Sequence, residues 1–249
     1  MEPSFLLVTE LGQDDPVVAT LRNLQIIDKV ISDSSEVEAL VDRNIVLYSW
    51  GKILPEEFIA RQRIVLNVHN SLLPRYRGRH AFTWALIHGE RSVGYTLHEV
   101  VKKPDAGDIY AQLEILLEPD DDINTVFKKG SENMVKWLPT QLKSISAGQL
   151  NPIKQDETLA TSFPRRGLSD MEINLDWDHL RISNFIRAHA PPYTRGAYIR
   201  SFGRLFFVEK ILSYDLKEDS KPNLDISRSK DCIFVQCADA LLELKISSI

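Results

Sequence analysis

IVLNVHNSLLPRYRGRHAFTWALIHGERSVGYTLHEVVKKPDAGDIYAQ, residues 64–112, is the most informative segment of this chain. It opens with a short apolar run, residues 64–66, that is typical of a buried strand. A polar turn over residues 74–79 and a helix over about residues 81–88 follow. A second strand is predicted over residues 92–101, and it leads into a tight loop at residues 102–107. This order indicates one unit of an α/β sheet.

Three polar side chains accompany these two strands. Residues two apart in a strand point to the same side, so Asn67 and His69 present an amide and an imidazole together at a strand end. Asp105 lies in the loop after the second strand, and open α/β sheets bind ligands near strand ends. An imidazole can move a proton, an amide can donate a hydrogen bond to an oxyanion, and a carboxylate can orient either the imidazole or a water. The set suits acyl transfer or hydrolysis through a tetrahedral intermediate.

A purely structural interpretation of the same residues stays open. Asn67 and His69 would then close a strand, and Asp105 would be a turn residue of Pro-Asp-Ala-Gly. Spacing alone favours this interpretation. No Ser or Cys stands in a nucleophile-elbow pattern, so an enzyme of this sequence would use direct attack by the acceptor.

A longer sequence motif favours the catalytic interpretation over the structural one. The string N-x-H-x-SLLPRYRG at residues 67–78, with DAGDI at residues 105–109, resembles the 10-formyltetrahydrofolate-dependent formyltransferase family. The catalytic Asn, His and Asp of that family fall on Asn67, His69 and Asp105. Asn70 departs from the family, which usually has a small residue or Pro there, and this leaves the three positions intact. The resemblance implies attack of an acceptor amine on the formyl carbon, with Asn67 and protonated His69 stabilising the oxyanion.

The resemblance also implies where 10-formyltetrahydrofolate binds. SWGKILP, residues 49–55, resembles the family's pterin loop, and the residues before Asp105 would supply the opposite wall. The residues expected to contact the cofactor are Trp50, Lys52, Ile53, Leu54, Val101, Lys102 and Lys103. Alternatively, Ile53 and Leu54 begin a core-facing helix, and the two lysines belong to a solvated turn.

The basic turn beside the motif is a candidate site for the acceptor. An arginine can bind a phosphate through two parallel hydrogen bonds. We therefore expect Tyr76, Arg77, Gly78 and Arg79 to contact the acceptor, with Arg77 or Arg79 on a phosphate or sugar hydroxyl. The alternative for each arginine is a surface salt bridge. His98 lies in the middle of a predicted strand and is interpreted as a structural histidine.

The rest of the N-terminal half alternates strands and helices. Strands are predicted over residues 4–9, 25–31 and 44–49, and helices over residues 14–23 and 34–41. Short alternation of this kind predicts a Rossmann-like, mostly parallel sheet with helices on its faces. No GxGxxG follows the first strand, so no dinucleotide fingerprint is present. A long helix is expected from about residue 121 to 146, with a kink or break at Pro139.

Two domains are expected, a catalytic domain over residues 1–150 and a linker with a small C-terminal domain over residues 151–249. Residues 148–162 are interpreted as a linker. From residue 163 the chain resembles the family's OB-like β-rich domain, with a helix over residues 178–188. Strands are predicted over residues 197–201, 205–212, 231–235 and 241–246, and a loop over residues 217–230. A packing or homodimer role suits this domain better than nucleic-acid binding.

Composition narrows the class of protein. The 249 residues carry a formal net charge of −5 and a pI of about 5.7, which argues against nucleic-acid binding as the main task. Cys232 and Cys237 form neither a disulfide framework nor a metal motif, and His80 and His88 show no metal spacing, so we expect a cytoplasmic protein without a metal. No apolar run approaches the roughly 18 residues of a membrane span.

Three functions remain open. The preferred acceptor is the primary amine of a dTDP- or UDP-linked amino sugar, as in lipopolysaccharide O-antigen biosynthesis, because RYRGR and TLHEVVKKPDAGDIYAQ resemble the sugar N-formyltransferases most closely. The alternative is methionyl-tRNA, although the usual basic insertion is not visible and the segment before Asn67 is shorter than usual for the family. The third is a folate-binding module without catalysis.

Overall fold

The computed structural model describes residues 4–201, 203–217, 228–229 and 231–247. The chain forms two compact units. The first unit comprises Met1–Ala81, Ser92–Leu116 and Lys128–Phe163, and the second comprises Phe82–Arg91, Leu117–Phe127 and Pro164–Ile249. Because each unit draws on separate stretches of chain, the expected domain boundary at residues 150 and 151 stays a prediction.

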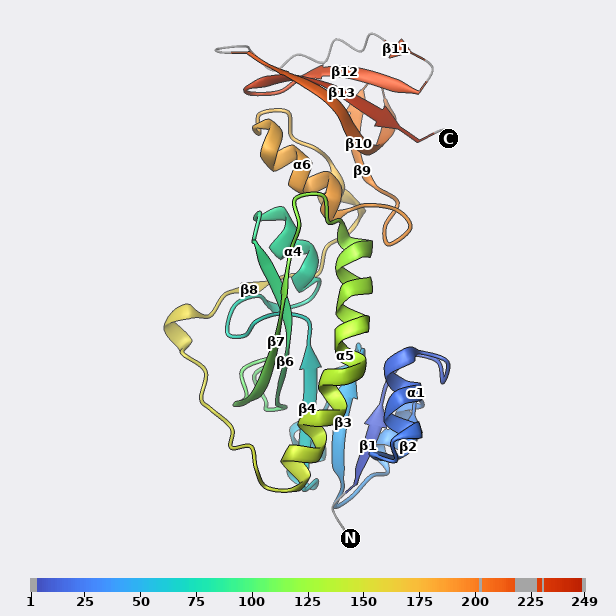
Figure 1. The fold of residues 1–249 in the computed structure, drawn as a ribbon, viewed down its shortest axis with the longest axis vertical. Coiled ribbons are helices and arrows are strands. Elements are labelled where there is room, and N and C mark those ends of the chain that lie inside the picture. Colours follow the sequence, from blue (N-terminus) through green and yellow to red (C-terminus); the bar gives the residue numbers. More distant parts are fainter. Residues whose placement is uncertain (1–3, 202, 218–227, 230, 248–249) are drawn as a thin grey trace. The chain divides into compact units, whose positions relative to one another are not determined.

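The first unit is built on a six-stranded sheet of order β2-β1-β3-β4-β6-β7 (Figure 1). Its strands are β1 (Phe5–Val8), β2 (Ile27–Ile31), β3 (Asn44–Tyr48), β4 (Ile64–His69), β6 (Ser92–Glu99) and β7 (Ile109–Leu116). The first four strands of this order pair in parallel, and β6 and β7 continue the sheet antiparallel. The predicted mostly parallel α/β sheet is confirmed, whereas β7 was not predicted.

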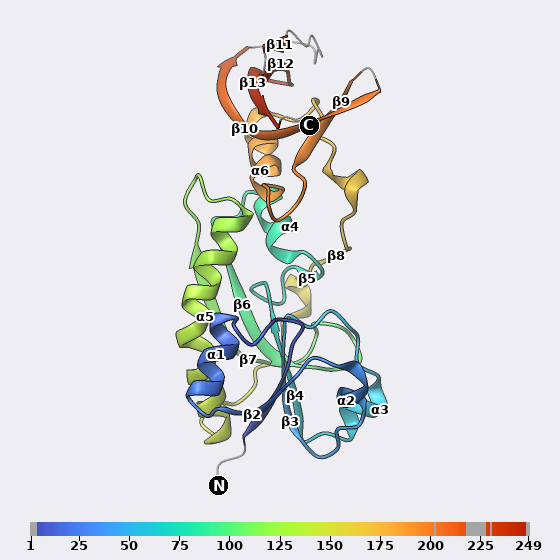
Figure 2. The ribbon, with the colours of Figure 1, turned by 90° about the vertical axis from the view of Figure 1, so that its right-hand side faces the viewer.

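Helices cover both faces of this sheet (Figure 2). They are α1 (Pro16–Asn23), α2 (Ser34–Glu38), α3 (Glu56–Ala60) and α5 (Ile123–Ser146), of which α5 contributes to both units. The Asp15 carboxylate caps α1 by accepting from the backbone N–H groups of Val17 and Val18 at 2.9 and 3.1 Å. One core cluster joins the sheet to α2 and α3 and contains Val8, Ile31, Val37, Ile45, Leu47, Phe58 and Val65.

Pro139 lies inside α5, and the helix continues through it. Of the predicted kink or break at this proline, the break is therefore wrong, and the kink stays a prediction. Leu138 and Leu142 on either side of it are fully buried. Burial of two leucine side chains stabilises by several kcal/mol, on the order of the roughly 3 kcal/mol that an interior proline costs a helix.

The segment interpreted as a linker is hydrogen-bonded to the first unit. The short strand β8 (Ser162–Phe163) pairs in parallel with β5 (Arg77–Gly78). An isolated antiparallel bridge joins Ile153 to Ile109, with N–H···O distances of 2.8 Å in both directions. Between these contacts lies the 3-10 helix η1 (Glu157–Leu159). Residues 153–163, here called the strap, therefore run along the turn and the loop that carry the candidate site residues.

The second unit contains α4 (Ala81–Ile87), the 3-10 helix η2 (Leu168–Met171), α6 (His179–Ala188) and an antiparallel sheet of order β11-β12-β13-β10-β9. The strands are β9 (Ala197–Ser201), β10 (Arg204–Leu216), β11 (Arg228–Ser229), β12 (Cys232–Gln236) and β13 (Ala240–Ile246). The predicted β-rich C-terminal fold is confirmed. Most of the loop expected over residues 217–230 lies outside the described residues, and residues 228–229 form β11.

Asp239 connects α6 to the hairpin between β12 and β13. Its carboxylate accepts from the backbone N–H of His179 at 2.8 Å and lies 2.6 Å from Nδ1 of the same histidine. The ring of His179 stacks on Tyr214 of β10, with 4.7 Å between centroids. These contacts hold the helix start against the sheet. In the residues described, no helix is both long and apolar enough to cross a membrane.

Candidate active site

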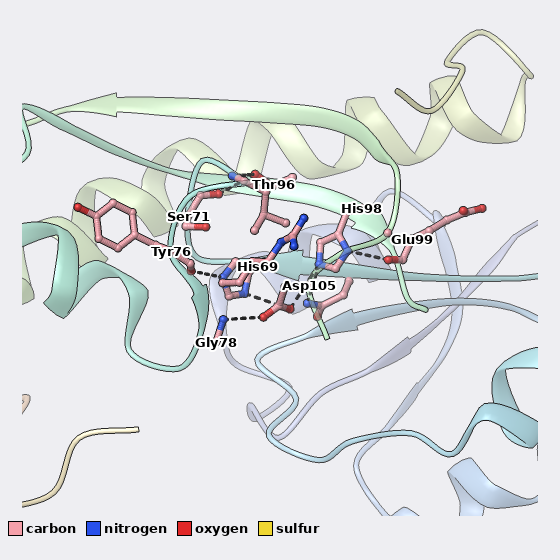
Figure 3. A network of polar contacts seen from close by, with 12 residues as sticks. His69, Ser71, Tyr76, Gly78, Thr96, His98, Glu99 and Asp105 are labelled. Atoms are coloured by element: carbon pink, nitrogen blue, oxygen red, sulfur yellow. Dashed lines mark hydrogen bonds and ion pairs between the residues drawn. The ribbon is translucent and has the colours of Figure 1, made fainter. Parts of the chain in front are cut away.

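Strand β4 places Asn67 and His69 on the same face of the sheet. Both residues lie within the strand rather than after it, because β4 extends to His69. The antiparallel register between β4 and β6 sets Asn67 opposite His98 and His69 opposite Thr96. Directly opposite residues of an antiparallel pair project to the same face. Figure 3 shows His69, His98 and Asp105 converging on one small volume.

His98 is a neutral hydrogen-bond acceptor inside this network. Its Nδ1 donates to the backbone carbonyl of Glu99 at 2.7 Å, so Nε2 carries the lone pair. Asn67 Nδ2 lies 3.2 Å from that Nε2 and donates to it. Burial, together with the neighbouring His69, lowers the pKa of His98 to about 4. His98 therefore fixes which end of the Asn67 amide carries its N–H groups into the site.

His69 lies between two oxygen acceptors. Its Nε2 donates to the backbone carbonyl of Tyr76 at 2.9 Å, and its Nδ1 lies 3.5 Å from Oδ1 of Asp105. A ring that satisfies both oxygens carries a hydrogen on each nitrogen. Only the Nε2 contact has hydrogen-bond geometry, and Nδ1 lies at ion-pair distance from Asp105, so a contact from Nδ1 to an oxyanion would not break the bond to Tyr76.

Asp105 faces both histidines. Its Oδ1 lies 3.5 Å from His69 Nδ1 and 3.8 Å from His98 Nε2, and its Oδ2 accepts from the backbone N–H of Gly78 at 2.8 Å. The side chain is 15% exposed. Its backbone has a φ of +55°, a conformation that non-glycine residues seldom adopt. The structure thus brings together the three side chains that the sequence predicts to be catalytic.

The two segments predicted to enclose the folate are neighbours. Trp50 and Leu54 pack against the core cluster, as does Val100, which precedes the second segment. Lys102 Nζ lies 3.0 Å from Glu56 Oε2 and links the two segments at the surface. Ile53 is 81% exposed and α3 starts only after Pro55, so the alternative of a core-facing helix start fails for Ile53.

Besides Lys102, three of the seven predicted folate contacts carry polar or charged groups in defined surroundings: Trp50, Lys52 and Lys103. Lys52 Nζ lies 5.0 Å from the centroid of the Trp50 ring and donates to the Ser34 hydroxyl. Lys103 lies 2.9 Å from Glu157 Oε2 rather than beside the Trp50 segment. The buried indole Nε1 of Trp50 has no hydrogen-bond partner among the residues that the structure describes, and a buried donor of this kind suits a ligand acceptor.

The basic turn differs from its predicted role. Arg77 is 3% exposed, and its guanidinium donates to Gln155 Oε1 and to the carboxylate of Glu157 at distances of 2.6 to 3.2 Å. The Tyr76 ring is buried and stacks on Phe163 at 5.2 Å. These side chains hold the strap, and the hypothesis that Arg77 binds an acceptor phosphate does not fit this geometry.

Gly78 and Arg79 also form contacts within the chain. Gly78 has a φ of +97°, and a Cβ there would lie 2.3 Å from the backbone oxygen of Phe163. Arg79 is exposed and donates to the backbone carbonyl of Gly51. Of the four residues, Arg79 alone combines an exposed charge with a position beside the predicted folate loop.

Two members of the site were not predicted from the sequence. His98 was interpreted as structural, and Gln155 was placed in a linker. The signal for His98 is the strand register, which sets it opposite Asn67. No local pattern marks Gln155, because its partners lie 48 to 78 positions away in the chain. Across the described part of the chain, no group of three or more His, Cys, Asp or Glu side chains could hold a metal ion.

Comparisons with known proteins identify the family of this chain. The family model described as formyl transferase matches residues 21–142. Methionyl-tRNA formyltransferase of Lactobacillus acidophilus is 34% identical over 213 residues, which are 82% of this chain and 65% of that protein. The Streptococcus uberis protein of the same name is 30% identical over 87% of this chain and 69% of its own length. The chain thus spans about two thirds of these relatives.

Solved structures share the fold at low sequence identity. Methionyl-tRNA formyltransferase from Clostridium thermocellum has a TM-score of 0.69 at 16% identity, covering 99% of this chain and 100% of that one. An N-formyltransferase from Helicobacter canadensis, in complex with folinic acid and dTDP-3-aminofucose, has a TM-score of 0.66 at 16% identity and covers 100% of both chains. The family predicted from the motif is confirmed, and the chain belongs to the formyl transferases.

Proposed function

We propose that this chain is an N-formyltransferase that uses 10-formyltetrahydrofolate as formyl donor. The observation that carries the proposal is the convergence of Asn67, His69 and Asp105 on one face of the sheet, at the end of β4. An amide donor, an imidazole and a carboxylate at this spacing supply an oxyanion contact and a path for a proton. Membership of the formyl transferase family supports the reaction class.

Each residue has a defined task in the proposed reaction. A bond forms between the acceptor nitrogen and the formyl carbon, the bond from that carbon to the folate nitrogen breaks, and the amine proton passes to the departing nitrogen. Asn67 would donate from Nδ2 to the carbonyl oxygen as it gains charge. Asp105 would take the amine proton, directly or through a water, and deliver it to the leaving nitrogen.

His69 can supply a second hydrogen bond to the developing oxyanion. Its contact with Asp105 at 3.5 Å is longer and weaker than its bond to Tyr76. The Nδ1–H group is therefore the one that can turn from Asp105 to the oxyanion at lower cost. This assigns His69 a role as second oxyanion donor, in its doubly protonated form.

The segments around residues 50–54 and 100–103 fit a folate. The flat pterin needs apolar walls and a few hydrogen-bonding groups, and the exposed side chains of Ile53 and Val101 lie on the two neighbouring segments. Trp50 Nε1, which has no partner within the described part of the chain, could donate to a ring oxygen or nitrogen of the folate. We retain Trp50, Lys52, Ile53, Leu54, Val101 and Lys102 as folate contacts, with Lys103 held by Glu157.

The acceptor that we favour is the primary amine of a dTDP- or UDP-linked amino sugar. The net charge of −5 opposes a polyanionic tRNA, and the Helicobacter canadensis structure holds a dTDP-linked amino sugar on this fold. Methionyl-tRNA is the second candidate, because the relatives from Lactobacillus acidophilus and Streptococcus uberis carry that name. A homodimer, a cytoplasmic location and a place in O-antigen biosynthesis stay predictions that accompany the sugar acceptor.

One assay separates these candidates. Release of tetrahydrofolate is followed after mixing the protein with 10-formyltetrahydrofolate and a panel of dTDP- and UDP-linked amino sugars, with charged initiator tRNA alongside. Turnover on one nucleotide sugar supports the preferred acceptor. Turnover on tRNA alone supports the second candidate, and in that case tRNA affinity should fall steeply with salt.

A further inference from the structure

Within the strap over residues 153–163, Gln155 binds the backbone of the site loop, and Glu157 binds the side chain of Lys103 in the same loop. Gln155 Nε2 donates to the backbone carbonyls of Asp105 at 2.9 Å and of Gly107 at 2.7 Å. Its Oε1 accepts from Arg77 at 3.2 Å from Nε and 2.7 Å from a terminal nitrogen. We infer that Gln155 is a positioning residue for Asp105, which fixes the carboxylate against His69. The inference rests on the proposed function.

The chemistry of the contact calls for an amide. Two backbone carbonyls on one side can only accept, and a guanidinium on the other side can only donate. A glutamate at position 155 would satisfy Arg77 and leave both carbonyls without a donor. An apolar residue would satisfy neither side. The glutamine amide, oriented as it is here, satisfies all the groups that face it.

Asp105 needs such support because of its backbone. A φ of +55° at a non-glycine residue persists only where the surroundings hold it. Two hydrogen bonds hold Asp105. The Gly78 N–H donates to its side-chain Oδ2, and Gln155 Nε2 donates to its backbone carbonyl. Gly107 lies so close to β6 that a Cβ there would be 2.0 Å from the Glu99 oxygen, which leaves the loop little room to move in that direction.

Arg77 anchors Gln155 in turn. The guanidinium is 3% exposed and also binds Glu157, which in addition contacts Lys103 at 2.9 Å. The bonds from Arg77 and Lys103 lower the pKa of Glu157 to about 2, so the carboxylate stays charged. Arg77 precedes Gly78, whose N–H binds Asp105, so β5 holds the Asp105 side chain directly and the Asp105 backbone through Gln155.

The test uses Gln155→Glu and Gln155→Met in the full chain. Gln149→Glu, the same change at an exposed position ahead of the strap, is the matched control. We expect both Gln155 variants to lose at least about tenfold in kcat with little change in the KM for the folate, since a small displacement of a catalytic group suffices for such a loss. The control variant should keep the wild-type kcat.

A double-mutant cycle that combines Gln155→Glu with Asp105→Asn distinguishes a positioning role from a general loss of structure. If Gln155 acts through Asp105, Gln155→Glu has almost no further effect on kcat once Asp105 is Asn. Losses that multiply in the double variant would overturn the inference, as would a wild-type kcat in both single variants.

Amide exchange provides a readout that does not depend on activity. The Gly78 N–H binds Asp105 Oδ2, so its exchange with deuterium should quicken in Gln155→Glu and Gln155→Met at unchanged Tm. Unchanged Gly78 exchange in both variants would contradict the positioning role. If the wild-type protein transfers no formyl group to any amine, the proposed function fails, and Gly78 exchange still decides whether Gln155 holds Asp105.

Discussion

Asn67 and His98 face each other across β4 and β6, with 3.2 Å between Asn67 Nδ2 and His98 Nε2. Because His98 Nδ1 donates to the Glu99 carbonyl, His98 can only accept from the amide in its neutral form. The pair therefore orients the group that we propose as oxyanion donor. It also adds to the site a histidine that was interpreted as structural from the sequence.

Replacing His98 by Phe should lower kcat by about tenfold while the protein stays folded. The phenyl ring keeps most of the buried volume but offers no acceptor, so the Asn67 amide loses its fixed orientation. The effect should be smaller than removal of an oxyanion donor itself, which typically costs about 100- to 1,000-fold. Steady-state kinetics measure the difference, with His88→Phe at an exposed position as control. An unchanged kcat would show that His98 does not orient Asn67.

His98 should also make stability depend on pH. Its folded pKa of about 4 lies below the ordinary value of 6.5, so between these values the unfolded chain binds a proton that the folded chain does not. The contribution is fully present above pH 6.5 and is lost as the pH falls toward 4, by up to about 3 kcal/mol. Urea unfolding of wild type and His98→Phe at pH 7 and pH 4.5 measures it. The wild type should lose more stability than the variant, and equal losses would contradict the neutral buried histidine.

Asn67→Ala should reduce kcat by about 100- to 1,000-fold with a small effect on folate affinity, since the amide acts on charge that develops during the reaction. Binding of folinic acid, followed by quenching of tryptophan fluorescence, provides the affinity. Near-normal turnover of a folded Asn67→Ala protein would remove the residue from the mechanism.

Gly78→Ala should destabilise the protein by more than Gly148→Ala. Both glycines have positive φ, of +97° and +67°, but a Cβ at Gly78 meets the Phe163 oxygen at 2.3 Å, and a Cβ at Gly148 meets nothing within 4 Å. The backbone cost alone is about 1 kcal/mol, and the clash should add about 2 kcal/mol by forcing β5 and β8 apart. Chemical denaturation of the two variants measures their free energies of unfolding. Equal decreases would show that β8 moves aside to accommodate the added Cβ.

Much of the first unit could be predicted from its local pattern. The alternation of apolar strands with short helices gives β1 to β4 within a few residues, and β-strand periodicity puts Asn67 and His69 on one face. β7 escaped prediction because IYAQLEIL is only partly buried and lacks a strong apolar run. Pro139 does not break α5, because burial of Leu138 and Leu142 outweighs the local cost of an interior proline.

The role of the strap could not be predicted locally. Gln155 and Glu157 stand in a polar, exposed-looking stretch, which is typical of a linker. Their partners are Arg77, Asp105 and Gly107, and these are identified only once the turn and the loop are folded. The same long-range contacts bury the Arg77 side chain, so it does not take the phosphate-binding role predicted for it.

We propose that the side chains of Asn67, His69 and Asp105 together catalyse formyl transfer from 10-formyltetrahydrofolate to an amine. The most direct test is tetrahydrofolate release by the wild type and by Asp105→Asn, with dTDP- and UDP-linked amino sugars and charged initiator tRNA as acceptors. We predict turnover on a nucleotide-linked amino sugar and a loss of at least about 100-fold in Asp105→Asn. No release with any acceptor, or equal rates for the two proteins, would contradict the account.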